Sequence, residues 1–220
     1  FIERQWLQTD FSCLADNNNL QSLYPVAKSI VDCMRECTDN FTQETHLNFS
    51  LLASAAEGVT GRFADYDYLH TSNHLLKEIA SKGYYSNSFH VPVDVSISSY
   101  EKIALESEFH SVCNGGCITY VEFSEMPASN TEAILDMVDY AFEKGCNYFG
   151  INFPLDNCTT CGHISRIGEA CPRCGGHDIK RLRRVSGYLA ESDRFTPGKY
   201  KEMLQRIGHD RINSYSSEEL

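Results

Sequence analysis

The 220-residue sequence lacks the features that mark membrane, secreted and repeat proteins. It holds no run of about 18 apolar residues, so no segment is expected to span a membrane. Its opening residues lack the basic, apolar and small-residue order of a signal peptide, and the chain shows no internal repeat or low-complexity segment. Because 42% hydrophobic and 22% charged residues are ordinary globular values, we expect a cytoplasmic protein of one or two folded units.

Positive charge is also scarce, since 19 Lys and Arg stand against 30 Asp and Glu and give a formal net charge of −11. Nonspecific affinity for nucleic acid comes mainly from counterion release by basic side chains, so free nucleic acid is not an expected partner. One local exception is the basic run KRLRR at residues 180–184. Such a run is usually a solvated face of the protein.

The ends of the chain carry two further expectations. The sequence begins at Phe1 rather than Met, with residues that already have the character of a mid-domain segment, which suggests a piece of a longer polypeptide. The polar segment NSYSSEEL at residues 213–220 is expected to be a disordered tail.

Hydrophobic periodicity predicts an α/β main domain. Apolar residues from Leu23 to Met34 recur at helical spacing, and Cys37 falls on that stripe with Cys33 at its flank, so both thiols are expected to act as small buried hydrophobic groups. The apolar segments 46–53 and 89–97 are expected to be strands, with a short helix at 73–83 between them.

The clearest unit is a strand, a helix and a second strand over residues 117–153. The sequence CITYVEF is followed by SNTEAILDMVDYAFEKG, in which Ser129 and Glu132 are expected to form a capping box and Gly145 to end the helix. NYFGINF then supplies another strand. A βαβ crossover of this kind normally joins two parallel strands.

Four of the ten cysteines form two CxxC pairs in the sequence CTTCGHISRIGEACPRC. Two such turns can aim four thiolates at one point, which is the tetrahedral set that Zn²⁺ accepts. With all four ligands supplied by protein, the zinc is expected to be structural, and the basic run that follows is placed to offset the negative charge of the thiolates. The expected ligands are Cys158, Cys161, Cys171 and Cys174. Each pair is followed by a glycine suited to a tight turn, Gly162 and Gly175.

Directly after these cysteines, the segment RRVSGYLAESDRFTPGKYKEMLQRIGH resembles the C-terminal signature of glycyl radical enzymes, in particular the anaerobic (class III) ribonucleoside-triphosphate reductases. The segments NFSLLASAAEG, YYSNSFHVPV and GGCITYVEF look like further parts of the same family in the same order, so the resemblance extends from about Leu47 onward. The matching residues of the signature are Arg184, Val185, Gly187, Tyr188, Leu189, Arg194, Phe195, Gly198, Lys199 and His209.

The resemblance implies a fold and a division of the chain. Residues 1–155 would form the C-terminal part of a ten-stranded β/α barrel, its second half, residues 156–181 a four-cysteine zinc-binding module, and residues 182–220 the glycyl radical loop and a C-terminal helix. The family also implies a homodimer in the full-length enzyme.

The resemblance further implies a chemistry in which Gly187 stores a radical made by an activating enzyme of the radical S-adenosylmethionine type. Only glycine suits this role, because a planar Cα radical delocalised over the backbone would be crowded by a Cβ. The radical would pass to a cysteine that abstracts the 3′ hydrogen of a ribonucleoside triphosphate, with formate as the usual reductant and deoxyribonucleotides for DNA synthesis as product.

The chain departs from the family pattern at several points. The hydrogen-abstracting cysteine is expected upstream, because none of the six other cysteines matches it: Cys13, Cys33, Cys37, Cys113, Cys117 and Cys146. Ser186 stands where many relatives have Cys, Cys117 where His is expected, and Ala55 where Pro is expected. For Glu57 and His90, a role in a pocket and an ordinary structural role both stay open.

Other interpretations also stay open. Gly187 could serve only a turn, the chain could belong to another glycyl radical enzyme of the formate-lyase type, or it could be a zinc-ribbon module whose basic run contacts nucleic acid. Because the chain lacks the hydrogen-abstracting cysteine and half of the barrel, it is expected to be inactive alone.

Overall fold

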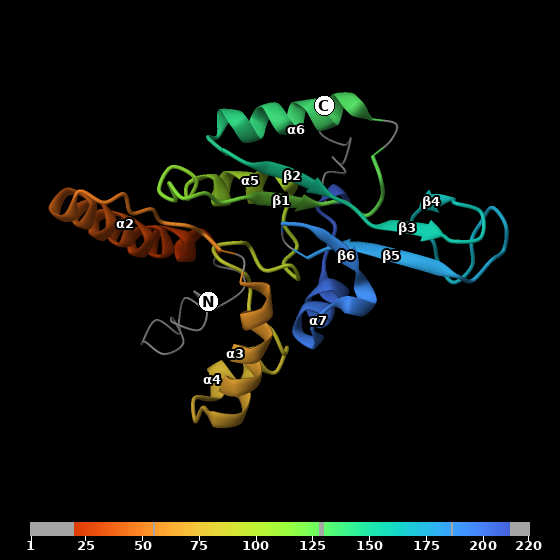
Figure 1. Ribbon diagram of the computed structural model, residues 1–220, viewed down its shortest axis with the longest axis horizontal. Coiled ribbons are helices and arrows are strands. Elements are labelled where there is room, and N and C mark those ends of the chain that lie inside the picture. The colour runs from red at the N-terminus through yellow and green to blue at the C-terminus, as the bar shows by residue number, and fades with distance from the viewer. Residues whose placement is uncertain (1–19, 55, 128–129, 186, 212–220) are drawn as a thin grey trace, which may run out of the picture.

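The structure is a computed structural model that describes residues 20–54, 56–127, 130–185 and 187–211. It is a mixed α/β arrangement, as the sequence predicted, and its strands form a two-stranded and a four-stranded sheet (Figure 1). The expected tail at 213–220 and Cys13 lie outside the described residues. The helices are α2 (Leu20–Thr45), α3 (Glu57–His70), α4 (His74–Ala80), α5 (Ser99–Ser107), α6 (Thr131–Glu143), α7 (Pro197–Gln205), and the 3₁₀ turns η2 (Ser192–Arg194) and η3 (His209–Arg211). The strands are β1 (Thr119–Glu122), β2 (Phe149–Asn152), β3 (Leu155–Cys158), β4 (Ile164–Ser165), β5 (Ile179–Arg184) and β6 (Leu189–Glu191).

The predicted βαβ crossover is confirmed. β1 and β2 pair in parallel, with Val121 opposite Ile151, and α6 connects them. Apolar side chains of α5, α6 and the strands form one buried cluster around Val121 and Met137, so the crossover helix covers the sheet. The helix cap differs from the expectation: Asn130 caps α6 by accepting a hydrogen bond from the Ala133 backbone N–H at 3.2 Å, and Ser129 lies outside the described residues.

Two predicted strands are wrong. Residues 46–53 form only an isolated bridge between Leu52 and Gly116, and residues 89–97 form turns. In the second segment the backbone N–H of Val91 donates to the Glu106 carboxylate at 2.9 Å, and the carbonyl of Val93 accepts from Ile207 at 2.9 Å. Val91 and Ile97 are buried, but Val93 and Val95 are only half-buried, and side chains and a distant backbone group, rather than a strand ladder, satisfy the backbone.

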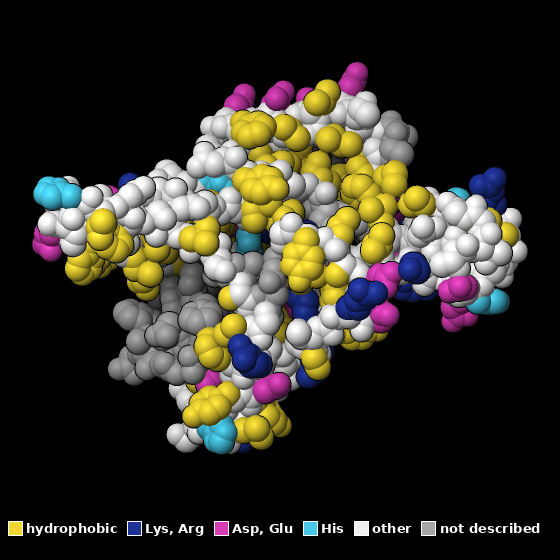
Figure 2. Space-filling model, in the orientation of Figure 1, with side chains coloured by type: hydrophobic (Ala, Val, Ile, Leu, Met, Phe, Trp, Pro, Cys, Tyr) yellow, Lys and Arg dark blue, Asp and Glu magenta, His cyan; other side chains and the backbone are white. Residues whose placement is uncertain are grey.

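The predicted first helix is confirmed as α2, but the expected burial of its stripe is wrong. Ala27 is buried, whereas Ile30 and Met34 are 47% and 50% exposed, and Cys33 and Cys37 are also exposed. Figure 1 shows α2 extending away from the two sheets, so little of the described chain reaches its far half. Figure 2 shows the hydrophobic side chains gathered on its surface.

The predicted short helix is confirmed as α4, which packs with α3 and α7 into a separate helical layer. α7 approaches α3 very closely at Gly198. A Cβ built on Gly198 would lie 2.7 Å from the Cα of Gly61 and 2.9 Å from the carbonyl oxygen of Gly83. Glycine is therefore required at position 198 for α7 to lie where it does, beneath the end of β5 (Figure 1).

Candidate functional site

The four cysteines of the two CxxC pairs come together as predicted. Their sulfur atoms all lie within 4.8 Å of one another, and the Sγ atoms of Cys158 and Cys174, and of Cys161 and Cys171, are 3.6 Å apart. Four sulfurs bound to Zn²⁺ at about 2.3 Å would have tetrahedral edges of about 3.8 Å. The donor set and its spacing therefore fit a tetrahedral zinc ion. Among the described residues no other group of His, Cys, Asp and Glu meets the same test.

The turns that carry these cysteines have the expected geometry. The backbone N–H of Gly162 donates to the carbonyl of Cys158 at 2.8 Å, and that of Gly175 donates to the carbonyl of Cys171 at 2.8 Å. Both glycines have positive φ, near 70°, as the tight turns require. The backbone amide of Cys161 hydrogen-bonds to the Cys158 thiol and lowers its pKa to about 6, which favours the thiolate that a metal binds.

The basic run is a solvated face only in part: Lys180 is exposed, but the arginines of the run form ion pairs with buried carboxylates. Arg181 and Arg183 of β5 donate to the two carboxylate oxygens of Asp156 at 3.2 and 2.6 Å, and Asp156 is fully buried in β3. The same carboxylate accepts the backbone N–H of Ile167, in the loop between the two CxxC pairs, at 2.8 Å. Asp156 therefore joins the four-cysteine module to β5, and these two arginines balance a protein carboxylate.

The third arginine of the run ties β5 to the parallel sheet. Arg184 forms an ion pair with Glu122 at the end of β1, and its guanidinium lies over the Tyr120 ring, 4.0 Å from the ring centroid. The carbonyl of Arg184 accepts from Arg206 at 3.0 Å. Burial alone would raise the pKa of Glu122, but Arg184 and Arg206 outweigh it and hold that pKa well below its ordinary value.

Gly187 lies in the connection between β5 and β6. The backbone N–H of Val185 donates to the carbonyl of Tyr188 at 2.8 Å, which closes an antiparallel hairpin with Gly187 at its tip. Gly187 is exposed, and a Cβ built on it would meet no atom within 4 Å. Ser186 lies outside the described residues. The loop therefore presents Gly187 on a firm strand pair with open space around it.

The chain that follows the hairpin returns to the same point on β1. The Nδ1 atom of buried His209 accepts the backbone N–H of Glu122 at 2.9 Å, and Asp210 accepts the backbone N–H of Ser124 at 3.0 Å. Burial lowers the pKa of His209 to about 4, so it is neutral near pH 7. Both ends of the segment that carries Gly187 are thus fixed to residues 122–124.

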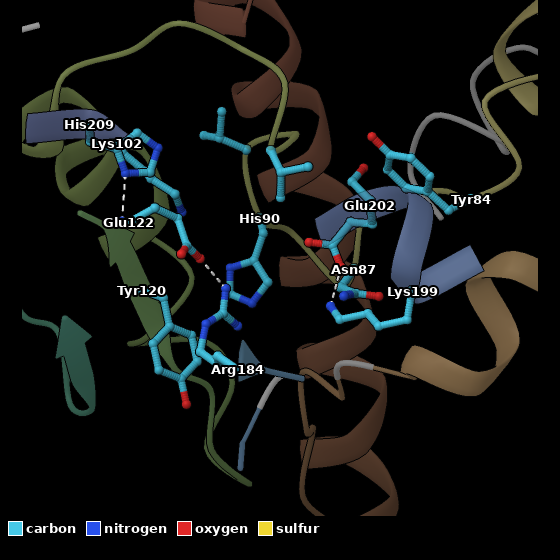
Figure 3. A pocket seen from close by; sticks show the side chains of 13 residues that line it. Tyr84, Asn87, His90, Lys102, Tyr120, Glu122, Arg184, Lys199, Glu202 and His209 are labelled. Atoms are coloured by element: carbon cyan, nitrogen blue, oxygen red, sulfur yellow. Dashed lines mark hydrogen bonds and ion pairs between the residues drawn. The ribbon is translucent and has the colours of Figure 1, made fainter. Parts of the chain in front are cut away.

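A cluster of buried charges lies beneath the hairpin, and most of its members line a small cavity (Figure 3). One ion-paired group is formed by Lys199 and Glu202 of α7 and by Arg206, which directly follows α7. A second group on α5 is formed by Lys102 and Glu106. His90 lines the cavity, and its Nδ1 atom lies 3.1 Å from a carboxylate oxygen of Glu106. Of the two residues for which the sequence left a pocket role undecided, His90 therefore lies in a pocket, and the Glu57 side chain is outside the described part of the structure. We call this group the charged cluster: Lys102, Glu106, Glu122, Arg184, Lys199, Glu202 and Arg206.

Sequence reasoning missed most of the charged cluster. Lys199 and Arg184 were noted as matching residues, but Glu122, Glu202 and Lys102 were not assigned a role. The available signal was the spacing of Lys199, Glu202 and Arg206 on one helical face, and a glutamate ending an apolar strand.

A second, larger cavity of about 780 Å³ lies at the carboxyl ends of β1 and β2. Among the described residues that line this cavity, Glu122 supplies the single carboxylate group. Four guanidinium groups face it, those of Arg166, Arg181, Arg183 and Arg206. We call this space the arginine groove.

Three unassigned thiols are buried away from the four-cysteine module, those of Cys113, Cys117 and Cys146. The Cys113 thiol hydrogen-bonds to Cys117 and, with burial, raises the pKa of Cys117 far above its ordinary value. A thiol in that state is a poor nucleophile at neutral pH.

Within the described part of the chain, no helix is long and apolar enough to cross a membrane.

Comparisons with known proteins agree with the resemblance. A family model described as anaerobic ribonucleoside-triphosphate reductase matches residues 14–209. The anaerobic ribonucleoside-triphosphate reductase of Escherichia coli (strain K12) is 35% identical over 191 residues, covering 82% of this chain and 26% of that protein. The reductase of the same name from Enterobacteria phage T4 is 34% identical over 194 residues, covering 84% of this chain and 31% of that protein. The chain thus spans less than a third of the length of either relative.

Solved structures show the same fold. One described as anaerobic ribonucleotide reductase superposes with a TM-score of 0.69 at 22% identity, over 85% of this chain and 29% of that chain. The anaerobic ribonucleotide reductase from Thermotoga maritima with glycerol in the active site gives a TM-score of 0.64 at 22% identity, over 82% of this chain and 28% of that chain.

Proposed function

The chain belongs to the anaerobic ribonucleoside-triphosphate reductase family, and we propose that it supplies the C-terminal part of such an enzyme. In this role residues 1–155 complete a ten-stranded barrel as its second half, residues 156–181 hold zinc, and residues 182–220 carry the radical loop. The observation that carries the proposal is that one hairpin strand, β5, connects the four-cysteine module to Gly187 within the matched region.

Gly187 is the residue that stores the radical in this proposal. Loss of one α-hydrogen leaves a planar Cα radical, which the neighbouring amide and carbonyl stabilise and which a side chain would crowd. Gly187 is exposed and a Cβ built on it meets no atom within 4 Å, which supports access to its α-hydrogen by an activating enzyme of the radical S-adenosylmethionine type. The Arg184–Glu122 ion pair and the His209 contact then hold the two ends of the loop in register with the barrel.

Zinc has a structural role in the proposal. Cys158, Cys161, Cys171 and Cys174 supply all four ligands, so no position is left for substrate. The ion would fix the loop whose Ile167 backbone binds Asp156, and Asp156 in turn fixes β5 through Arg181 and Arg183. Metal binding would therefore stiffen the strand that ends three residues before Gly187.

The proposed reaction replaces the 2′-hydroxyl of a ribonucleoside triphosphate with hydrogen and releases water. Formate supplies the two electrons and leaves as carbon dioxide. The hydrogen-abstracting cysteine is supplied from outside this chain, because none of its cysteines matches the family position and the buried thiols Cys113, Cys117 and Cys146 are packed in the core. We further propose a cytoplasmic homodimeric enzyme, in which this chain alone is inactive.

The alternatives are less well supported. A zinc-ribbon module that binds nucleic acid would need free basic groups, but Arg181, Arg183 and Arg184 pair with Asp156 and Glu122. The family match over residues 14–209 favours a ribonucleotide reductase over a glycyl radical enzyme of the formate-lyase type.

The test is electron paramagnetic resonance of a reductase that contains this chain, activated without oxygen. A doublet is expected, because the unpaired electron couples to the one remaining α-hydrogen, and deuterated glycine should collapse the doublet. Air should then cleave the backbone near Gly187. A radical signal insensitive to glycine deuteration would contradict the proposal, as would deoxynucleotide formation by the 220-residue chain alone with activator and formate.

A further inference from the structure

The arginine groove has more positive charge than its ion pairs neutralise. Its four arginines, the charged groups that the lining residues contact, and Lys199, which shares Glu202 with Arg206, bring six cations to four carboxylates. The cations are Arg166, Arg181, Arg183, Arg184, Lys199 and Arg206, and the carboxylates are Glu122, Asp156, Glu202 and Asp210. The surroundings of the groove therefore have a net charge of +2, although the whole chain has a formal net charge of −11. Positive charge concentrated around one concave surface attracts anions.

Arg166 supplies the least satisfied guanidinium of the groove. It is exposed and forms no ion pair within the described chain, and its Nη1 atom donates to the backbone carbonyl of Ser124 at 3.1 Å. The next residue, Ile167, is fixed by the hydrogen bond from its backbone N–H to Asp156. Arg166 thus projects from a fixed backbone and keeps donors for an incoming anion.

Two further arginines of the groove are held in place and still have unused donors. Arg183 donates through Nη1, to Asp156 at 2.6 Å and to backbone carbonyls, which leaves its Nε and Nη2 groups without partners in the described chain. Arg206 bonds to Glu202 through Nε at 2.8 Å and to the Arg184 carbonyl through Nη2 at 3.0 Å, and its Nη1 group has no partner among the same residues. Because ion pairs already fix these side chains, an anion that binds them orders little that is not already ordered.

The size of the groove and the directions of its arginines indicate a ligand with several anionic groups. Its volume is about 780 Å³, whereas one water molecule needs about 10–15 Å³ on the same scale. Guanidinium groups reach it from three segments: the loop after β4, the strand β5 and the residue after α7. We propose that the arginine groove binds a chain of about two to three phosphate groups, whose oxygens match guanidinium forks.

Part of the groove is apolar, and this part distinguishes two sources of such a chain. Tyr200 and Leu204 of α7 line the groove and are 44% and 66% exposed. An organic group attached to the phosphates would contact these side chains, whereas an inorganic polyphosphate would not. Among the described residues the groove shares only Glu122 with the small cavity of the charged cluster, so the phosphate site is distinct from that cavity.

The test is a calorimetric titration of the 220-residue chain with sodium tripolyphosphate at constant ionic strength, with NMR of the backbone amides to locate the ligand. Tripolyphosphate should bind about tenfold or more tightly than sulfate, and it should shift the amides of residues 152–154, 166–168 and 203–208. Adenosine triphosphate separates the two sources. Tighter binding than tripolyphosphate, with a shift at Tyr200, assigns an organic polyphosphate, and equal or weaker binding assigns an inorganic one.

Two substitutions test the groove itself. Arg166→Gln should weaken tripolyphosphate binding about tenfold, because it removes a charged donor without breaking an ion pair of the described chain. Its matched control is Arg173→Gln, which changes an exposed arginine between the second pair of cysteines that does not line the groove. Leu204→Glu should also weaken binding, because it adds a carboxylate to the groove at an exposed position, and Leu135→Glu on α6 is its control.

Several results would overturn the proposal. They are unchanged binding in the folded Arg166→Gln and Leu204→Glu variants, equal affinity for sulfate, and amide shifts confined to residues 84–93. Tighter binding of hexaglutamate or of a short single-stranded oligonucleotide would also overturn it, because the groove would then fit an acidic peptide or a nucleic acid. The titration needs neither a radical nor an activator, so its outcome is independent of the role of Gly187.

Discussion

Two glycines in the C-terminal segment should respond to alanine in opposite ways. At Gly198 the added methyl group would lie 2.7 Å from the Gly61 Cα and 2.9 Å from the Gly83 carbonyl oxygen, and both are backbone atoms that cannot rotate away. At Gly187 the same methyl group meets nothing within 4 Å. Gly198→Ala should therefore destabilise the fold and Gly187→Ala should not.

The magnitudes follow from these contacts. Overpacking costs about 1–3 kcal/mol, and the upper end applies to Gly198 because α3 and α7 must separate. The better helix propensity of alanine returns up to about 1 kcal/mol, which leaves a net loss of about 2 kcal/mol and a fall in Tm of about 6 °C. For Gly187→Ala the change in the free energy of unfolding should stay within about 1 kcal/mol.

The assay pairs thermal unfolding of the chain with electron paramagnetic resonance of a reductase that contains it. Gly187→Ala should keep its Tm and lose the radical signal. Gly198→Ala should have a lower Tm, and its radical signal should remain in proportion to the amount of folded protein. A Gly187→Ala enzyme that activates and reduces nucleotides would return Gly187 to the role of a turn residue. A Gly187→Ala chain as unstable as Gly198→Ala would refute the steric reasoning.

Two other predictions concern metal and pH. Cys171→Ser should contain much less zinc by elemental analysis, because a closed four-sulfur site depends on every thiolate. Cys37→Ser, at an exposed position, should keep its zinc, and a full zinc content in Cys171→Ser would contradict the site. The folded pKa of His209 is about 4, below its ordinary value near 6.5, so the unfolded chain takes up the proton first and the free energy of unfolding should fall by about 3 kcal/mol as pH drops from about 6.5 to about 4. Denaturant unfolding at each pH measures this fall. His209→Gln should reduce it, and His110, whose pKa burial also lowers, accounts for part of what remains. An equal pH dependence in His209→Gln would contradict the assignment.

Features that depend on near neighbours in the chain were predictable. The spacing of Cys158, Cys161, Cys171 and Cys174 fixed the four-sulfur cluster, because each CxxC turn sets its own two thiols. The βαβ unit followed from helical and strand periodicity in one short stretch. The strand predicted at 89–97 failed because its backbone groups bond to Glu106 and Ile207 rather than to a partner strand, which an alternation of apolar residues does not reveal.

Features that depend on distant partners were decided by the tertiary structure. The sequence by itself determined the family, the four-cysteine cluster as a candidate zinc site and Gly187 as the radical candidate. It did not determine that Arg184 pairs with Glu122, 62 residues earlier in the chain, or that Asp156 balances two arginines of a run that composition would place in solvent. A charge is stabilised by whatever lies within a few ångströms, and only the packing of β1, β3 and β5 brings these carboxylates and cations to that distance.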